Sequence, residues 1–340
     1  MIKRAIFDKK NVLITGGAGF IGSHLCDELV KNNKVICVDN FITGNEKNID
    51  RLLANPNFAF IKANINERLD LESMPELQKF KIQFQGVQEI YNLACPTSPV
   101  NFNQNKKEMI LTNSLGVKNM LDLAVKYNST FIQFSSSIVY GPRQEGDSKI
   151  AENNLGIVDP VGERSSYDEG KRFAESMVTN YNKIHNIDTK IARIFRTYGP
   201  RMKLEDKQMI PDFINNALEG KDLIIYGDEN FNTSLCYIDD IVDAVIKLAS
   251  NDITEPMNIG SDQDENLTEV AKKIIQLTNS KSKIAYKEAE IFVTQLAIPD
   301  ITKAKNEINW MPITTLDNGI EKTVDALRAS KGLLGVENAV

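Results

Sequence analysis

The sequence has few cysteines and histidines and no excess of positive charge, and each shortage excludes a class of protein. Its four cysteines are widely spaced and none forms a Cys-x-x-Cys pair, so we expect reduced, buried thiols and neither a disulfide framework nor a zinc site. His24 and His185 lack the spacing of metal ligands, so no metal is expected. The net charge of -6 provides no basic surface for nucleic acid or an anionic membrane.

Long hydrophobic runs are also missing. No apolar segment approaches the roughly 18 residues that a membrane-spanning helix needs. The first eight residues do not form the apolar core of a signal peptide. We therefore expect a soluble, cytoplasmic protein without membrane association.

What the sequence does contain is an alternation of short apolar runs and longer helical patterns, which indicates repeated βαβ units. The fold class predicted is α/β, with a Rossmann-type, doubly wound parallel sheet. We expect a Rossmann domain over 1–195, to which part of 235–260 returns, a smaller interleaved α/β substrate domain mainly over 196–330, and a tail over 331–340. The strands are expected at 11–15, 35–39, 58–61, 89–93, 130–135 and 190–195, with a helix over 23–32.

A glycine-rich segment follows the first expected strand. Gly17, Gly19 and Gly22 fit G-x-G-x-x-G, and Gly16, Gly19 and Gly22 fit a second spacing of the same motif. Such a turn lets the backbone approach a pyrophosphate and directs a helix N-terminus at it. Asp39 follows Gly19 by about 20 residues, where an acid meets the adenosine ribose. No arginine follows Asp39 immediately, so NAD is favoured over NADP.

A tyrosine and a lysine share one face of a later expected helix. Tyr167 and Lys171 are four residues apart, so the ammonium can lower the pKa of the phenol from about 10. Ser136 lies at the end of an expected strand, where ligands bind in open α/β sheets. Tyr167 is then the general base that removes a hydroxyl proton, with Ser136 holding the same oxygen.

In this order, the glycine motif, the acid, the serine and the Tyr-x-x-x-Lys pair resemble the extended short-chain dehydrogenase/reductase family of NAD-dependent epimerases and dehydratases. Residues 92–99, 166–172 and 192–202 are most similar to its UDP-glucuronate decarboxylase (UDP-xylose synthase) branch, and 226–228 and 237–240 fit the same template. Residues 309–312, with Leu316 and Gly319, resemble the usual C-terminal pattern of the family. The resemblance implies bound NAD, a UDP-sugar substrate, oxidation at C4, loss of carbon dioxide and reduction of the ketone. It also implies a homodimer through a four-helix bundle of helices at about 103–127 and 167–185.

Site residues are expected on both sides of the reaction centre. The catalytic residues are Tyr167, Lys171 and Ser136. The expected cofactor contacts are Gly16, Gly19, Phe20, Ile21, Gly22, Asp39, Asn40, Gly44, Asn64, Ile65, Leu93, Ala94, Thr112, Tyr167 and Lys171. The expected substrate contacts are Pro96, Ser98, Ser137, Arg196, Arg201, Tyr226 and Thr233.

Three positions depart from the branch it resembles. Ile138 stands where the pattern Ser-Thr-Ser-Glu-Val-Tyr-Gly has its glutamate, and Ser137 with Ile138 replaces the Asp-Glu pair of a 4,6-dehydratase. Thr233 stands where the family has an arginine at the diphosphate or carboxylate. Arg196 replaces an asparagine beside the diphosphate, and we hypothesise that it partly restores the missing charge.

These departures leave several functions open. The chain is expected to decarboxylate a UDP-hexuronate to the UDP-4-keto-pentose or to UDP-xylose. A UDP-sugar 4-epimerase, acting on UDP-glucuronate or a UDP-hexose, is the alternative. A non-catalytic NAD-binding regulator is a second alternative, against which the retained Tyr167 and Lys171 argue.

Overall fold

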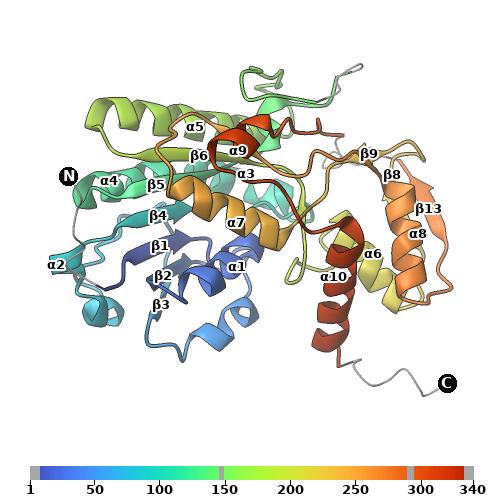
Figure 1. Ribbon diagram of the computed structural model, residues 1–340, viewed down its shortest axis with the longest axis horizontal. Coiled ribbons are helices and arrows are strands. Elements are labelled where there is room, and N and C mark those ends of the chain that lie inside the picture. Colours follow the sequence, from blue (N-terminus) through green and yellow to red (C-terminus); the bar gives the residue numbers. More distant parts are fainter. Residues whose placement is uncertain (1–7, 145–148, 289–294, 333–340) are drawn as a thin grey trace.

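The computed structural model describes residues 8–144, 149–288 and 295–332. Two lobes of unequal size are apparent, with the sheet and most helices in the larger one (Figure 1). Most of the expected tail, 333–340, lies outside the described residues. None of the helices in the described part of the chain combines the length and apolar character that a bilayer crossing needs.

Seven parallel strands form the sheet of the larger lobe, in the order β11-β6-β5-β4-β1-β2-β3. The predicted doubly wound parallel fold is therefore confirmed. Its strand order reverses between β1 and β4, which opens a crevice at the carboxyl ends of these strands. The strands are β1 (Asn11–Thr15), β2 (Lys34–Asp39), β3 (Phe58–Lys62), β4 (Glu89–Asn92), β5 (Thr130–Ser136), β6 (Thr189–Ile194) and β11 (Met257–Ile259).

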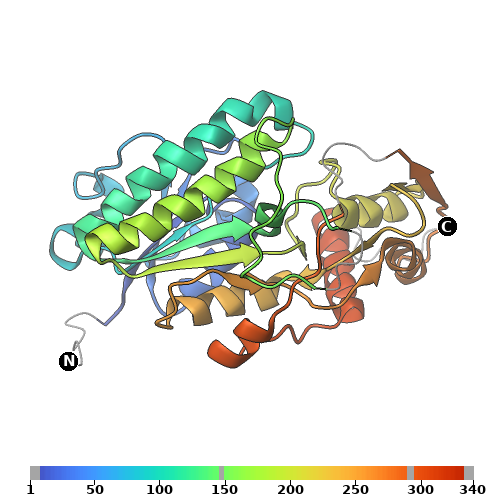
Figure 2. The same cartoon turned by 90° about the horizontal axis from the view of Figure 1, so that it is seen from above.

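Helices cover both faces of this sheet, which explains why its strands read as apolar runs. On one face, α1 and α7 pack against Val12, Ile14 and Ile132. On the other, α4 and α5 pack against Leu13, Ile36 and Phe131, and Figure 2 shows these two helices side by side. The helices of the larger lobe are α1 (Phe20–Leu29), α2 (Ile82–Gln85), α3 (Phe102–Leu111), α4 (Val117–Tyr127), α5 (Ser165–His185) and α7 (Ile238–Ala249), with short helical turns η1 (Glu46–Asn48), η2 (Asp50–Leu52), η3 (Pro75–Phe80) and η5 (Ser137–Tyr140).

The smaller lobe is built from two-stranded pairings and helices drawn mainly from the second half of the chain. Strand β8 pairs with β13, β9 with β12, and β7 with β10. Because β11 returns to the large sheet, the chain crosses between the lobes more than once (Figure 1). The elements are β7 (Thr197–Tyr198), α6 (Met209–Leu218), β8 (Leu223–Tyr226), β9 (Asn232–Thr233), β10 (Cys236–Tyr237), β12 (Glu265–Asn266), α8 (Leu267–Leu277), β13 (Ile284–Lys287) and α10 (Leu316–Ser330). Helix α9 (Thr302–Glu307) instead packs against β11 of the large sheet.

Helix α1 begins earlier than the sequence suggested. It runs over Phe20–Leu29, whereas we expected 23–32. No side chain caps its first turn, and its N-cap is Gly19 in an extended conformation. The helix therefore starts inside the glycine motif, and its first backbone N–H groups are left for a ligand.

One π-helical turn, η4 (Thr112–Gly116), joins α3 to α4 without a break in the helical path. Such turns occur often at functional sites, because they shift side chains relative to a regular helix. Gly116 within it lies so close to Ile65 that a Cβ there would be 2.9 Å from the Ile65 side chain. The close approach brings Thr112 and Ile65 to the same cavity.

Candidate active site

A cleft of about 1210 Å³ lies where the two lobes meet, at the carboxyl ends of the sheet strands. The larger lobe contributes the glycine loop, the residues that follow β4, the end of β5 and the first turns of α5. The smaller lobe contributes the segment 199–208 and one side of α10. This is the place where open α/β sheets bind their ligands.

The glycine loop is packed too closely for larger residues. Gly16 has a φ of 67°, and a Cβ on it would lie 2.9 Å from the backbone nitrogen of Ala94. A Cβ on Gly22 would lie 2.2 Å from the carbonyl oxygen of Gly16. The turn therefore presents bare backbone and the uncapped start of α1 to the cleft, which is a site for a pyrophosphate.

Asp39 ends β2 at the floor of the cleft and is 8% exposed. Its two carboxylate oxygens accept hydrogen bonds from the backbone N–H groups of Ala18 (3.0 Å) and Phe41 (2.8 Å). Burial raises the pKa of Asp39, while these N–H groups lower it. Each oxygen retains a lone pair for a further donor, as ribose hydroxyl groups would require.

A chain of buried hydrogen bonds crosses the middle of the sheet below the cleft. The Thr15 hydroxyl donates to Asn92 Oδ1 (2.7 Å), and Asn92 Nδ2 donates to Gln133 Oε1 (2.9 Å). Gln133 Nε2 donates in turn to the carbonyl of Phe134 (3.3 Å). These bonds join β1, β4 and β5 at the level of the glycine loop.

The predicted catalytic residues come together at one wall of the cleft. Lys171 is buried, and its ammonium donates to the carbonyl of Phe134 (2.8 Å). Tyr167, one turn earlier on α5, is hydrogen-bonded to the Ser136 side chain at the end of β5. Burial, the largest cause, and the nearby Cys95 thiol raise the pKa of Tyr167, whereas the Ser136 bond and the charge of Arg164 lower it. The net direction is upward, so the lowering of this pKa expected from Lys171 is wrong for the protein without bound ligands, because burial outweighs it. All three predicted residues line the cleft.

Every expected cofactor contact lies on the cleft wall. The four expected substrate contacts that also line it are Pro96, Ser98, Arg196 and Arg201. Arg201 is paired with Asp27 (2.6 Å) and donates to Ser23 (3.2 Å), both on α1.

Three expected substrate contacts lie away from the cleft lining. Ser137 is buried in η5, and Thr233 is buried with its hydroxyl on the carbonyl of Ser234 (3.3 Å). Tyr226 is half-buried at the end of β8. None of the three belongs to the described residues that line the cleft, and their roles stay predictions.

Comparison with known proteins agrees with this architecture. The model of the NAD dependent epimerase/dehydratase family matches residues 12–260. This chain belongs to that family. It is 38% identical over 327 residues to UDP-glucuronic acid decarboxylase 5 of Arabidopsis thaliana, covering 95% of this chain and 90% of the relative. It is 36% identical over 322 residues to UDP-glucuronic acid decarboxylase 1 of Xenopus tropicalis, covering 94% and 73%.

The fold has close counterparts among solved structures. A UDP-glucuronic acid 4-epimerase from Bacillus cereus, in complex with UDP-glucuronic acid and NAD, superposes with a TM-score of 0.80 at 26% identity. The match covers 94% of this chain and 99% of the epimerase. The chain is accordingly an NAD-dependent nucleotide-sugar enzyme.

The glycine loop and Asp39 fit this cofactor. The Gly16–Gly22 approach leaves no room for a Cβ, so backbone N–H groups can reach the pyrophosphate. Gly44 lies beside the acid, since a Cβ there would be 2.8 Å from Asp39 Oδ1. These residues would hold the adenosine half of NAD, and Tyr167 and Lys171 lie further along the same cleft.

Sequence reasoning missed several residues of the cleft. Asp206 is buried beside it and accepts a hydrogen bond from Ser98, although 108 positions separate the two. Thr323 and Leu327 bring α10 to the cleft wall. Arg164, directly before α5 and behind the residues that line the cleft, was missed as well; burial and then the charge of Arg164 lower the pKa of Arg196 to about 10. The sequence alone could have pointed to Arg164, because it lies three residues before Tyr167.

We expect Gly22→Ala to weaken NAD binding about tenfold or more, because its Cβ would displace the backbone carbonyl of Gly16. Gly220→Ala is the matched control. Its φ is 68° and nothing lies within 4 Å, so it should cost about 1 kcal/mol of stability and leave NAD binding intact. Calorimetric titration measures the affinity of both variants for NAD, and circular dichroism confirms that each variant is folded. An unchanged dissociation constant for Gly22→Ala would contradict this account of the loop.

Proposed function

We propose that this enzyme is a UDP-glucuronate decarboxylase, which oxidises C4 of the glucuronosyl ring and releases carbon dioxide. The observation that carries the proposal is the similarity to such decarboxylases along nearly the whole chain. The segment most like that branch, Asn-Leu-Ala-Cys-Pro-Thr-Ser-Pro at 92–99, contributes six consecutive residues, 93–98, to the cleft wall.

The first step follows from the geometry around Tyr167. The phenolate form of Tyr167 takes the proton of the C4 hydroxyl, and Ser136 donates a hydrogen bond to the same sugar oxygen. Lys171, whose ammonium is fixed on the Phe134 carbonyl, favours that phenolate electrostatically. Bound NAD supplies the acceptor for the hydride that leaves C4.

Decarboxylation needs little further help from side chains. Once C4 is a ketone, the C5 carboxylate is a β-keto acid, and the electron pair left by carbon dioxide is delocalised as an enolate. Ile138 is buried in η5 where the branch has glutamate, so it cannot return a proton to C5. A solvent proton would complete the step, and the product is then either the UDP-4-keto-pentose or, after reduction, UDP-xylose.

A second candidate is 4-epimerisation of the same substrate. The apolar Ile138 favours it, because an epimerase needs no acid at that position. The likeness in fold to a UDP-glucuronic acid 4-epimerase also supports it. Both candidates share a C4 oxidation in which Tyr167 takes the hydroxyl proton and NAD would accept the hydride, and they differ only in the fate of the 4-keto intermediate.

Arg196 is the best-placed cation for the substrate's negative charge. It lines the cleft directly after β6, and its guanidinium lies 6.0 Å from the centre of the Phe231 ring. Burial, and after it the charge of Arg164, lower the pKa of Arg196 to about 10, although Arg164 is itself paired with Asp168 (3.2 Å). A buried guanidinium on a cleft wall suits an anionic ligand. This supports a role for Arg196 at the diphosphate, in place of the arginine lost at Thr233.

A homodimer is also part of the proposal. The expected interface helices correspond to α3, η4 and α4 on one side and α5 on the other, and these segments pack together. Most of the apolar stripe of the first, including Met109 and Met120, is buried against the chain's own core. Ile110, Leu115 and Phe173, however, are 53%, 42% and 52% exposed, which supports an interface there.

Incubation with UDP-glucuronate and NAD should release carbon dioxide and give a sugar nucleotide lighter by its mass, measured by mass spectrometry. Tyr167→Phe should lower kcat by about a hundredfold or more, because it removes the general base. A product of unchanged mass but altered chromatographic retention would establish the epimerase instead. No conversion of any sugar in a panel of UDP, GDP, CDP and dTDP derivatives, with NAD bound, would refute both reactions.

Arg196→Ala should raise the KM for UDP-glucuronate about tenfold or more, through loss of one charge-assisted contact, while the affinity for NAD stays the same. Arg201→Ala is an informative comparison, because Arg201 also lines the cleft but is already paired with Asp27. Steady-state kinetics and titration with the sugar nucleotide measure the two variants. Unchanged affinity of Arg196→Ala for the UDP-sugar would reject the role at the diphosphate.

Light scattering during size-exclusion chromatography should give twice the chain mass of 38.1 kDa. Phe173→Asp should shift the protein to monomers, because it places a charge on the apolar face. Ile313→Asp, at a side chain 79% exposed in a segment bound to α7 on the opposite face of the sheet, should leave the dimer unchanged. A monomeric wild-type protein at micromolar concentration would rule out this interface.

A further inference from the structure

A nearly buried ion pair lies beside the catalytic residues and takes no part in the oxidation or the decarboxylation. It joins Arg193 of β6 to Glu175 of α5, whose side chains are only 11% and 12% exposed. The guanidinium donates through Nε to Oε1 (3.0 Å) and through Nη2 to Oε2 (2.8 Å), so the contact is bidentate. Neither side chain belongs to the cleft lining.

On one side, this ion pair is tied to the end of β5. The Ser135 hydroxyl donates to Glu175 Oε1 (2.5 Å), and Ser135 is directly followed by Ser136. One helical turn before Glu175, Lys171 donates to the carbonyl of Phe134. Helix α5 is therefore attached at two successive turns to the residues that precede Ser136.

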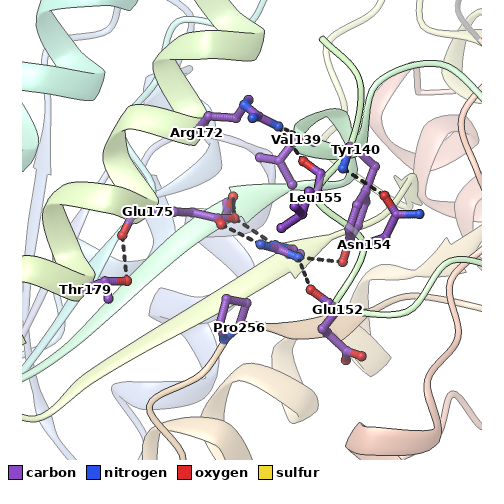
Figure 3. Close-up of polar contacts among 12 residues, drawn as sticks. Val139, Tyr140, Glu152, Asn154, Leu155, Arg172, Glu175, Thr179 and Pro256 are labelled. Carbon is purple, nitrogen blue, oxygen red and sulfur yellow. Dashed lines mark hydrogen bonds and ion pairs between the residues drawn. The ribbon is translucent and has the colours of Figure 1, made fainter.

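On the other side, the same guanidinium holds the segment that follows Ser136. Arg193 Nη1 donates to the Tyr140 hydroxyl (2.8 Å) and to the carbonyl of Glu152 (3.0 Å). Tyr140 ends η5 and donates to Asn258 of β11 (2.7 Å). Figure 3 shows Tyr140, Glu152 and Glu175 converging from three separate segments.

We propose that the Arg193–Glu175 ion pair is a positioning device, which holds α5, the end of β5 and η5 in the one arrangement that keeps Tyr167 within reach of Ser136. The proposal rests on the roles of Tyr167 and Ser136 in the proposed function. A bidentate, nearly buried pair suits this task, because its planar geometry fixes orientation as well as distance. Reacting groups need such support, since small displacements at a site cost large factors in rate.

The arrangement has a consequence for the ionisation of Tyr167. The groups that act on the pKa of its hydroxyl are Cys95 after β4, Ser136 of β5, Arg164 directly before α5 and Asp168 in its first turn. Lys171, one turn further along α5, lines the same cleft. Of these, Ser136 acts through a hydrogen bond that favours the phenolate. If α5 shifts and this bond is lost, the base form of Tyr167 is reached only at higher pH.

The test uses the full-length enzyme with NAD in three variants: Glu175→Gln, Arg193→Lys and the double variant Arg193→Met with Glu175→Gln. In Glu175→Gln, the acidic limb of the kcat profile should move up by about one pH unit, the size of one charge-assisted hydrogen bond. At neutral pH, kcat should fall about tenfold, with the KM for UDP-glucuronate changed less than about twofold. Arg193→Lys, which keeps the charge but loses the planar contact, should show a smaller shift in the same direction.

The double variant separates positioning from stability. Removing both partners leaves no uncompensated charge, so its Tm should recover towards that of the wild type, while the pH profile stays displaced. Val178→Ala is the matched control, because Val178 is fully buried in the apolar core on the same helix and its side chain takes no part in the ion pair. It should lower Tm without moving the pH profile. Hydrogen exchange of residues 136–141 and 165–171, which needs no substrate, should be faster in the double variant and unchanged in Val178→Ala.

The positioning role and the proposed function are rejected by different results. An unmoved pH profile in Glu175→Gln, with a fall in Tm like that of Val178→Ala, would reduce the pair to a stabilising contact and overturn the proposal. A pH profile of the double variant that matched the wild type would also overturn the proposal. The shift in Glu175→Gln would then come from the unpaired charge of Arg193 and not from lost positioning. If the wild type converts no nucleotide sugar, the proposed function fails, and hydrogen exchange alone decides the positioning role: unchanged exchange in the double variant rejects it.

Discussion

The catalytic edge of this enzyme depends on the requirement that polar groups inside a sheet find partners. Thr15, Asn92 and Gln133 are all 0–1% exposed and lie on three adjacent strands. Their hydrogen bonds run from the strand that feeds the glycine loop to the Phe134 carbonyl, which also holds Lys171. Because an unpaired amide in such a layer costs on the order of 1–3 kcal/mol, a slip in strand register is disfavoured at each link. The cofactor loop and the catalytic lysine are thereby held in one frame.

A second buried polar system meets the first at the end of β5. The ion pair of Arg193 and Glu175 anchors α5 to β6. The chain of amide hydrogen bonds that starts at β1 ends on the carbonyl of Phe134 in β5. Ser136 lies at the junction of the two. Apolar packing alone tolerates small rotations of a helix, whereas charged and amide groups have few acceptable geometries. Tyr167 lies on α5, the helix that these charged and amide groups hold in place.

The sequence pattern predicted the larger lobe well, because parallel strands and their helices leave local signals. The strand at 11–15 was confirmed with its bounds, and the glycine loop and Asp39 lie in the cleft as expected. The start of α1 was wrong by three residues, since no capping side chain marks it. Contacts between distant segments left no such signal. The Ser98–Asp206 bond and the set of partners around Arg193 arise only once the chain has folded.

None of the three departures from the decarboxylase pattern falls on the residues proposed for the oxidation step. Those residues, Tyr167, Lys171 and Ser136, all line the cleft. Ile138, by contrast, is 4% exposed, so an ionised glutamate could not replace it without a partner. Thr233 is likewise buried, while Arg196 lies on the cleft wall. Under the proposed function, an arginine lost at a buried position and gained at a lining one moves positive charge to the cleft wall. The presence of Tyr167 and Lys171, which line the cleft together with Ser136, argues against a non-catalytic NAD-binding regulator.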